Sequence, residues 1–173
     1  MTREEMVGLA DASKEQYFLT NPDKLRQLVD AADIRPSDRV VELGAGVGTV
    51  ARALPSVASL TLVEMDGRLV VALRRNVPNA TIICADGVAL IQDGALPCDV
   101  LLCNLPTDVT NSLIPTLPGL NFRTAVLSVG SLCELDRARG TLSYSIITTI
   151  TDDDFTPPQP GRSTLVRVER VKG

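Results

Sequence analysis

The sequence contains no histidine and no tryptophan, and only two tyrosines and three phenylalanines among its 173 residues. Without histidine, no catalytic mechanism that uses an imidazole as base is open to this chain. Aromatic residues make up 3% of the chain and apolar residues 45%, so any core must be mainly aliphatic. A chain of this length can bury such a core within one domain. We therefore expect a single domain over residues 1–173, with a short helical extension at about residues 1–35.

Recognisable metal ligands are also missing. The four cysteines include no Cys-x-x-Cys pair, and with no histidine nearby we expect no metal site. Cys84 and Cys103 stand in apolar, strand-like runs, which predicts buried free thiols.

No apolar run is long enough to span a bilayer, and the charged start of the chain, residues 1–5, is not followed by an apolar signal segment. We therefore expect a cytoplasmic protein without a membrane partner. The net charge is −4, with 14 arginines and only three lysines. Because nucleic-acid affinity rests largely on neutralising phosphates, this acidic balance disfavours, without excluding, a long RNA or DNA footprint.

Short apolar runs alternate with helical patterns through most of the chain, which is typical of a parallel sheet. The expected strands cover residues 40–43, 59–64, 81–85, 99–103 and 124–129, and helices are expected at 22–32, 47–54, 67–76 and 132–138. Two β-rich runs near the end, 141–150 and 163–171, have no helix between them, which predicts an antiparallel edge hairpin. The predicted fold is α/β: a Rossmann-like, seven-stranded, mostly parallel sheet with helices on both faces.

The most informative stretch is Glu42-Leu-Gly-Ala-Gly-Val-Gly-Thr49, directly after an apolar strand. Gly44, Gly46 and Gly48 allow a tight turn and let a ligand approach the main chain. The spacing differs from the dinucleotide pattern, and no Gly-Lys-Ser/Thr follows, which disfavours a phosphate-binding loop. The stretch resembles the first motif of class I S-adenosylmethionine methyltransferases.

Three further groups are expected at the ends of strands. Glu64 lies 20 residues after Gly44, where nucleotide-binding α/β folds place the carboxylate that binds ribose hydroxyls. Asp86 follows the next strand and either accepts a hydrogen bond from an adenine amino group or caps the following helix.

The third group is Asn104-Leu105-Pro106. Pro106 has no backbone N–H, so the Leu105 carbonyl is free to face a ligand. Together with the Asn104 amide oxygen it would give two acceptors converging on one amino group. Such a pair would aim the lone pair of a conjugated amine at a methyl donor without a strong base.

With these residues in view, the chain resembles the catalytic domain of the ribosomal-RNA adenine N6-dimethyltransferases. Four stretches over roughly residues 14–171 carry the resemblance: Gln16-Tyr-Phe-Leu19, Glu42–Thr49, Asn104-Leu-Pro106, and Phe155-Thr-Pro-Pro-Gln-Pro with the following Ser163–Val168.

The resemblance implies S-adenosylmethionine as cofactor and S-adenosylhomocysteine as product. It implies that Asn104 binds the target nitrogen and that Phe18 and Phe155 flank the target ring, with Thr107 beside them. The implied cofactor contacts, besides those already derived, are Gln16, Tyr17, Leu19, Glu42, Ala45, Met65, Gly87 and Asn104 itself.

The chain departs from the family at several places. Thr107 stands where the family has an aromatic residue that stacks on the target base, and Tyr17 replaces the family's asparagine. The chain also stops where the family continues into a helical RNA-binding domain. With the acidic net charge, these departures favour a small-molecule acceptor with a nitrogen nucleophile. Adenine N6 methylation of RNA and a non-catalytic S-adenosylmethionine-binding protein are the alternatives, and the oligomeric state is left open.

Overall fold

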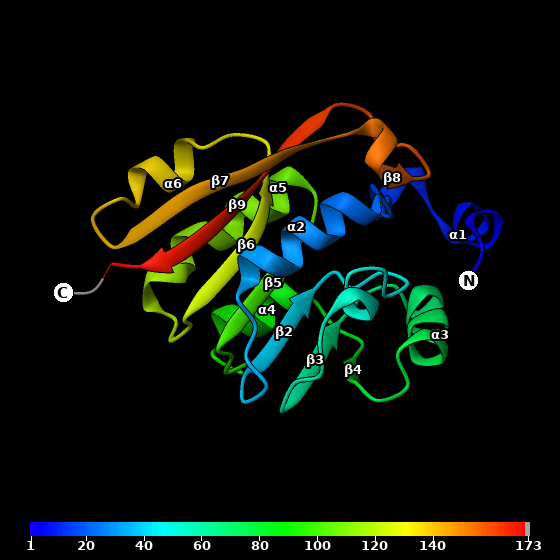
Figure 1. Ribbon diagram of the computed structural model, residues 1–173, viewed down its shortest axis with the longest axis horizontal. Helices are drawn as coiled ribbons and strands as arrows, with labels where there is room; N and C mark the ends of the chain where they lie inside the picture. Colours follow the sequence, from blue (N-terminus) through cyan, green and yellow to red (C-terminus); the bar gives the residue numbers. More distant parts are fainter. Residues whose placement is uncertain (172–173) are drawn as a thin grey trace.

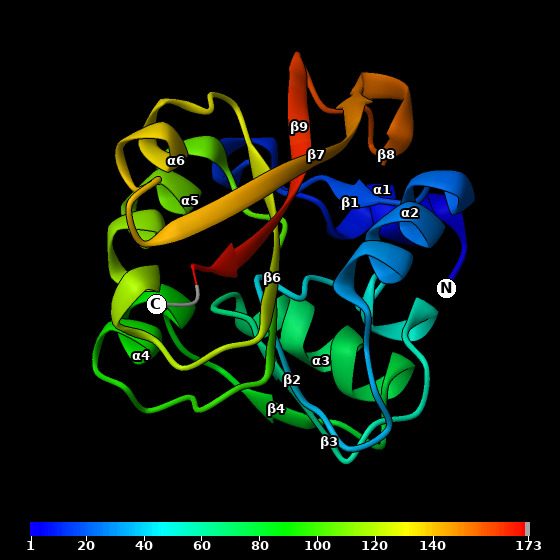
Figure 2. The same ribbon diagram turned by 60° about the vertical axis from the view of Figure 1, so that its left-hand side comes forward.

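Parallel β-strands alternate with helices from residue 39 to residue 129, as the sequence pattern predicts. The structure is a computed structural model that describes residues 1–171, shown in Figures 1 and 2. The five parallel strands are β2 (Arg39–Leu43), β3 (Ser59–Val63), β4 (Thr81–Ile83), β5 (Val100–Cys103) and β6 (Thr124–Val129). Two long antiparallel strands, β7 (Leu142–Thr151) and β9 (Arg162–Arg170), complete a sheet with the order β4-β3-β2-β5-β6-β9-β7. The predicted fold class, including the edge hairpin, is confirmed.

Helices cover both faces of this sheet. The α-helices are α1 (Arg3–Leu9), α2 (Pro22–Ala32), α3 (Gly67–Asn76), α4 (Gly87–Gln92), α5 (Thr107–Leu113) and α6 (Cys133–Arg137). The 3-10 helices are η1 (Ala12–Lys14), η2 (Ala51–Ala53), η3 (Ile114–Gly119) and η4 (Asp152–Asp154). In Figure 2, α4, α5 and α6 lie on one side of the sheet and α1 and α2 on the other.

Alternation along the central strands supplies a separate core to each face. Leu101, Cys103 and Leu127 pack with residues of α4, α5 and α6. Val100 and Leu102 point the other way and pack with residues of α2. Because both faces of these strands are covered, they read in the sequence as continuous apolar runs.

Three helices begin at polar caps that can be read in the sequence. Asn21 accepts hydrogen bonds from the backbone N–H groups of residues 23 and 24, with Pro22 in the first turn of α2. Asp66 caps α3, and Asp86 caps α4 by accepting from the N–H groups of residues 88 and 89. Each capping residue comes two or three positions after the end of a strand, so the loops from β1 to α2, β3 to α3 and β4 to α4 are short.

The expected α-helix over residues 47–54 is wrong. The chain forms turns there and only the 3-10 helix η2. Gly48 has a left-handed backbone with φ of +85°, and Leu54, which precedes Pro55, is extended. These two restrictions leave fewer than two helical turns between them, which is too short for a stable α-helix.

Two other features differ from expectation. Cys84 is exposed, because β4 ends at Ile83 and is an edge strand, whereas Cys103 is buried as predicted. A two-stranded antiparallel sheet pairs β1 (Phe18–Leu19) with β8 (Phe155–Thr156). Strands of two residues show no periodicity, so the sequence did not reveal this pairing.

Within the described residues 1–171, no helix combines the length and apolar character needed to cross a bilayer. The same residues contain no cluster of three or more Asp, Glu, Cys or His side chains that could hold a metal ion.

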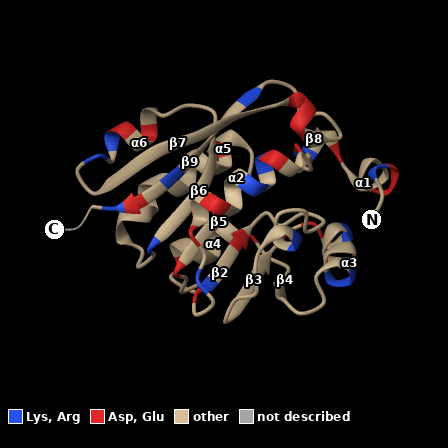
Figure 3. Ribbon diagram, in the orientation of Figure 1, with Lys and Arg blue, Asp and Glu red and all other residues tan. Residues whose placement is uncertain are grey.

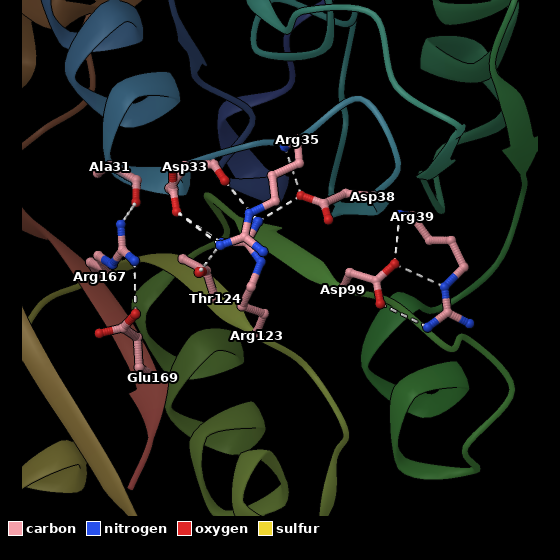
Figure 4. A network of polar contacts seen from close by, with 10 residues as sticks. All are labelled: Ala31, Asp33, Arg35, Asp38, Arg39, Asp99, Arg123, Thr124, Arg167 and Glu169. Carbon is pink, nitrogen blue, oxygen red and sulfur yellow. Dashed lines mark hydrogen bonds and ion pairs between the residues drawn. The ribbon is translucent and has the colours of Figure 1, made fainter. Parts of the chain in front are cut away.

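An ionic network closes the edge of the sheet where the parallel strands begin (Figure 4). The guanidinium of Arg123 donates to the Asp38 carboxylate at 2.6 Å, and to the Asp33 carboxylate and carbonyl at 3.0 and 2.7 Å. Arg39 binds Asp99 with two side-chain hydrogen bonds of 2.9 and 3.0 Å. Only 8% of the Asp38 side chain is exposed, so the ion pair with Arg123 offsets the cost of burying this carboxylate.

We expect Arg123→Met to lower the free energy of unfolding by about 2 kcal/mol, because it leaves the Asp38 carboxylate buried without its cation. Arg26→Met is the control: Arg26 and its partner Asp23 are both about two thirds exposed, and its loss should cost no more than about 0.5 kcal/mol. Urea denaturation of the two variants measures the difference, and equal costs would contradict this role for Arg123.

Candidate active site

A cavity of about 470 Å³ lies at the carboxyl ends of the parallel strands. Its walls come from the glycine turn after β2, the loops after β3, β4 and β5, and the N-terminal segment before β1. The strand order passes from β3 through β2 to β5, so the cavity lies at the topological switch point, where open α/β sheets bind ligands. Its size is within the usual range for small-molecule sites.

The glycine turn is held by short backbone contacts. Gly44 and Gly46 have left-handed backbones, with φ of +68° and +55°, and both line the cavity. The N–H groups of Gly44 and Ala45 donate to the Val63 carbonyl at 2.9 and 3.0 Å. A Cβ on Gly44 would lie 2.1 Å from the Leu105 side chain. Glycine is therefore required here both by the backbone conformation and by the contact with the loop after β5.

Glu64 joins the glycine turn to the start of α3. Its Oε2 accepts from the Gly46 N–H at 2.8 Å, and its Oε1 accepts from the Asp66 N–H at 2.9 Å. The side chain is buried and borders the cavity. Each carboxylate oxygen has a second lone pair, so the group can still accept hydrogen bonds from a ligand.

Asp66 is the point where the N-terminal segment is attached to this framework. Lys14 and Gln16 both donate to its Oδ2 at 2.9 Å, and Arg68 donates to the same oxygen at 2.7 Å. Arg68 also lies 3.7 Å from the carboxylate of Asp11. The hydrogen bonds from Arg68, Gln16 and Lys14 hold the pKa of the Asp66 carboxyl far below its usual range. This anchor places residues 14–18 along one wall of the cavity.

Glu42 is buried just below the glycine turn and does not line the cavity. Burial, and then the nearby Glu64 carboxylate, raise the pKa of Glu42 to about 8. Its Oε2 makes no hydrogen bond with the part of the chain that the structure describes. At neutral pH the Glu42 carboxyl is therefore mainly protonated.

Asn104, Leu105 and Pro106 border the cavity together. The side chain of Asn104 makes no hydrogen bond with residues 1–171, so its amide oxygen is free for a ligand. The Leu105 carbonyl receives the hydroxyl of Thr110 at 3.4 Å, a long contact that leaves a lone pair available. Asp86 also borders the cavity, and because both capping bonds go to its Oδ1, its Oδ2 remains free.

The structure brings most of the predicted site residues to one cavity. Those that line it are Gln16, Tyr17, Phe18, Gly44, Gly46, Glu64, Met65, Asp86, Gly87, Asn104, Leu105 and Pro106. Their contacts with cofactor or acceptor stay predictions.

Six predicted residues lie outside the lining, for identifiable reasons. Leu19 and Phe155 are paired across the small sheet and are buried in the core, with 1% and 3% exposed. Gly48 faces Leu73 and Val77 instead of the cavity.

The remaining three are Glu42, described above, Ala45 and Thr107. Ala45 is buried in a core cluster with Leu62. Thr107 is exposed, at the first position of α5, and lies against Gly130, where an added Cβ would be 2.7 Å from its side chain.

Sequence reasoning missed eight lining residues: Lys14, Glu15, Val63, Asp66, Leu69, Ala85, Val88 and Val109. Asp66 could have been found, because an acid two residues after Glu64 and directly before a helix is a typical cap. Lys14 gives no local signal, since its partner is 52 residues away in the sequence.

The model of the ribosomal RNA adenine dimethylase family matches residues 10–114 of the chain. This chain belongs to the ribosomal RNA adenine dimethylase family. A mitochondrial ribosomal RNA small subunit methyltransferase of Arabidopsis thaliana is 35% identical over 123 residues, which cover 66% of this chain and 32% of that protein. Membership of the family confirms the predicted resemblance and agrees with the expected methyltransferase class.

Solved structures show the same fold. A dimethyladenosine transferase from Plasmodium falciparum superposes with a TM-score of 0.78 at 21% identity, covering 89% of this chain and 63% of that one. The 23S rRNA methyltransferase ErmE gives a TM-score of 0.75 at 18% identity, covering 90% of this chain and 72% of that one. The matched part of this chain spans 32% of the length of the Arabidopsis relative and 45% of the length of a relative from Moorella thermoacetica.

The predicted small-molecule acceptor is wrong, because the matching family and the Arabidopsis relative are both named for ribosomal RNA. The prediction gave too much weight to net charge. Several carboxylates, such as Asp38, Asp66 and Asp99, are bound to arginines or lysines within the fold, so the sum over the chain does not describe the surface that an RNA would meet.

The raised pKa of Glu42 predicts a pH dependence of stability. The folded state keeps the proton up to about pH 8, whereas the unfolded chain loses it near pH 4.5. Between these values the folded state binds more protons, so this group makes the free energy of unfolding fall as pH rises. We expect Glu42→Gln to flatten the loss between pH 5 and pH 8, as measured by urea denaturation. Exposed Glu4→Gln is the matched control, and the same slope in all three proteins would contradict the assignment.

Residues 14–18 form the N-terminal wall of the cavity, and loss of the charge on Asp66 should release them. We expect Asp66→Asn to weaken S-adenosylmethionine binding by about tenfold, because Lys14 and Arg68 lose their common partner. Isothermal titration calorimetry measures the affinity, and hydrogen exchange of residues 11–18 should quicken in parallel. Asp23→Asn removes an exposed aspartate that pairs with Arg26 on α2, and it should change neither readout. Unaltered affinity in Asp66→Asn would refute the anchoring role.

Proposed function

We propose that this chain is the catalytic part of a methyltransferase that uses S-adenosylmethionine to methylate the N6 amino group of adenine in ribosomal RNA. The observation that carries the proposal is a cavity at the carboxyl end of the sheet that brings the glycine turn, Glu64 and Asn104-Leu105-Pro106 together in a member of the ribosomal RNA adenine dimethylase family. The activity, the acceptor and the individual contacts are all parts of this proposal.

The cavity has the shape and charge that the cofactor needs. Gly44 and Gly46 present bare main chain, and Glu64 retains lone pairs that suit ribose hydroxyls. The free Oδ2 of Asp86 can accept from the adenine amino group of the cofactor. The lining holds four acids and one lysine, so it favours a ligand that carries positive charge. Bound S-adenosylmethionine supplies a methyl group on a positively charged sulfur.

The acceptor side consists of two oxygens beside one proline. The Asn104 amide oxygen and the Leu105 carbonyl each accept a hydrogen bond from one N–H of the adenine amino group. Holding both hydrogens turns the nitrogen lone pair away from the ring and toward the methyl group, so positioning lowers the barrier. The chain has no histidine to serve as base. As the C–N bond formed, the bond between the methyl group and the sulfur would break, and S-adenosylhomocysteine would leave as a neutral thioether. The methylated amine would then be acidic and would lose its proton to solvent water.

An adenine within a helix cannot reach this cavity, so the base must be unpaired or flipped out. RNA phosphates then require cations nearby. Arg74 and Arg75 at the end of α3, and Arg52 in η2, make no ion pair with the residues that the structure describes. Figure 3 marks positions of basic residues in blue on the ribbon of α3. These guanidinium groups are available for phosphate contacts, and the expected cytoplasmic location belongs to the same proposal.

We expect the purified chain to transfer methyl groups from S-adenosylmethionine to small-subunit ribosomal RNA that lacks methylated adenine. Nuclease digestion and mass spectrometry should then show N6-methylated adenosine. Asn104→Ala should lower turnover by about 100-fold, because the amine is no longer held, and should leave cofactor affinity unchanged by calorimetry. Asn79→Ala, in an exposed turn, is the control. Turnover by Asn104→Ala at the normal rate would remove the assigned role, and methylation of another base would overturn the proposal.

A further inference from the structure

The chain has five aromatic side chains, and three of them lie outside the cavity lining. Phe122 and Phe155 are in the core, with 5% and 3% exposed. Phe18 borders the cavity, but it packs against Gly46, where an added Cβ would lie 3.0 Å from its ring, and only 6% of Phe18 is exposed. Tyr144 is on β7, where its hydroxyl donates to Asp136 and Arg139 lies 5.3 Å from its ring centre.

Tyr17 is the more exposed of the two aromatic side chains that border the cavity. It lines the cavity together with Asn104, Leu105 and Pro106. It is half-buried, and its apolar part packs against the core cluster that contains Leu19 and Phe155. Its hydroxyl makes no hydrogen bond with residues 1–171. Tyr17 therefore combines a supported ring with exposure to the site.

Both neighbours of Tyr17 are fixed. Gln16 donates to Asp66 at 2.9 Å and also accepts from the Asp11 N–H at 3.0 Å. Phe18 is paired with Thr156 in the small sheet and rests on the glycine turn. Because its two neighbours in the chain are held, and Tyr17 itself packs against the core, the Tyr17 ring loses little freedom when a ligand stacks on it, which favours binding.

A base that leaves its stack loses the contact of its faces with neighbouring bases, and enzymes that flip bases replace it with apolar or aromatic surface. Thr107, which directly follows Pro106, offers no aromatic or apolar surface to a flipped base, because its side chain lies against Gly130 and does not border the cavity. Of the two aromatic side chains that border the cavity, Tyr17 thus presents more ring surface to an acceptor.

We propose that Tyr17 is the stacking surface for the acceptor adenine, which lies between the Tyr17 ring and the acceptor oxygens at Asn104 and Leu105. The inference rests on the proposed function and reassigns Tyr17 from the cofactor, where the family resemblance placed it, to the acceptor. Stacking needs the ring alone, so the free hydroxyl is not required.

The test compares Tyr17→Leu, which keeps apolar bulk without a ring, with Tyr17→Phe, which keeps the ring. With unmethylated small-subunit ribosomal RNA as substrate, Tyr17→Leu should raise KM for the RNA by about tenfold or more. Its S-adenosylmethionine affinity by calorimetry should stay within about twofold of the original. Tyr17→Phe should match the unaltered protein in both measurements. Tyr144→Leu removes a half-buried tyrosine outside the cavity and serves as control.

Two outcomes would overturn the assignment. An unchanged KM for RNA in Tyr17→Leu would show that the ring does not contact the acceptor. A loss of cofactor affinity as large as the change in KM would place Tyr17 against the cofactor. Both outcomes are distinct from failure of the proposed function, in which the unaltered chain would methylate no adenine at all. Circular dichroism of each variant separates these results from misfolding.

Discussion

The carboxylate of Glu64 holds the functional end of the sheet together. One of its oxygens binds the Gly46 N–H and the other binds the Asp66 N–H, so a single buried group fixes both the turn after β2 and the entry to α3. Without it, two backbone donors would be left unpaired in a buried place, at a cost of about 1–3 kcal/mol each. The position of Asp66, and through it the N-terminal wall, depends on this one side chain.

The same arrangement explains why a second glutamate can be buried nearby. Glu42 ends up beside Glu64 without a hydrogen-bond partner for Oε2, and two charges there would repel each other in a poorly solvated place. The pair resolves this by keeping the proton on Glu42. Glu64 accepts hydrogen bonds from two backbone N–H groups, whereas the Oε2 of Glu42 accepts none from the described residues. Glu42 can thus be buried at this place because it is mainly neutral at pH 7.

Local signals in the sequence were sufficient for most of the sheet and for several helices. Apolar runs located β2, β3, β5 and β6, and helical spacing of apolar residues located α2 and α3, because these features depend on residues within a few positions of each other. Long-range contacts were not accessible in this way. The attachment of Lys14 and Gln16 to Asp66 spans about 50 residues, and the pairing of Phe18 with Thr156 spans more than twice that.

The candidate site shows the same division. The glycines predicted close approach, but only the fold reveals that Gly44 makes room for Leu105 and that Gly48 makes room for α3. The resemblance to a family placed Phe155 beside the target ring, yet its pairing with Leu19 buries it. A motif therefore locates the site, while the side chains that face the ligand are decided by packing between segments far apart in the sequence.

Net charge misled the choice of acceptor for a related physical reason. Screening limits the reach of exposed charges to about 10 Å, so an RNA responds to the charges near its phosphates and not to the total. In this fold several acids form ion pairs: Asp38 with Arg123, Asp66 with Lys14 and Arg68, and Asp99 with Arg39. Each such pair takes up a cation as well as an acid, so the positions of the unpaired arginines relative to the unpaired carboxylates set the local potential that a polyanion meets. An acidic chain can therefore present a basic surface, and its acceptor has to be inferred from the site instead of from the sum.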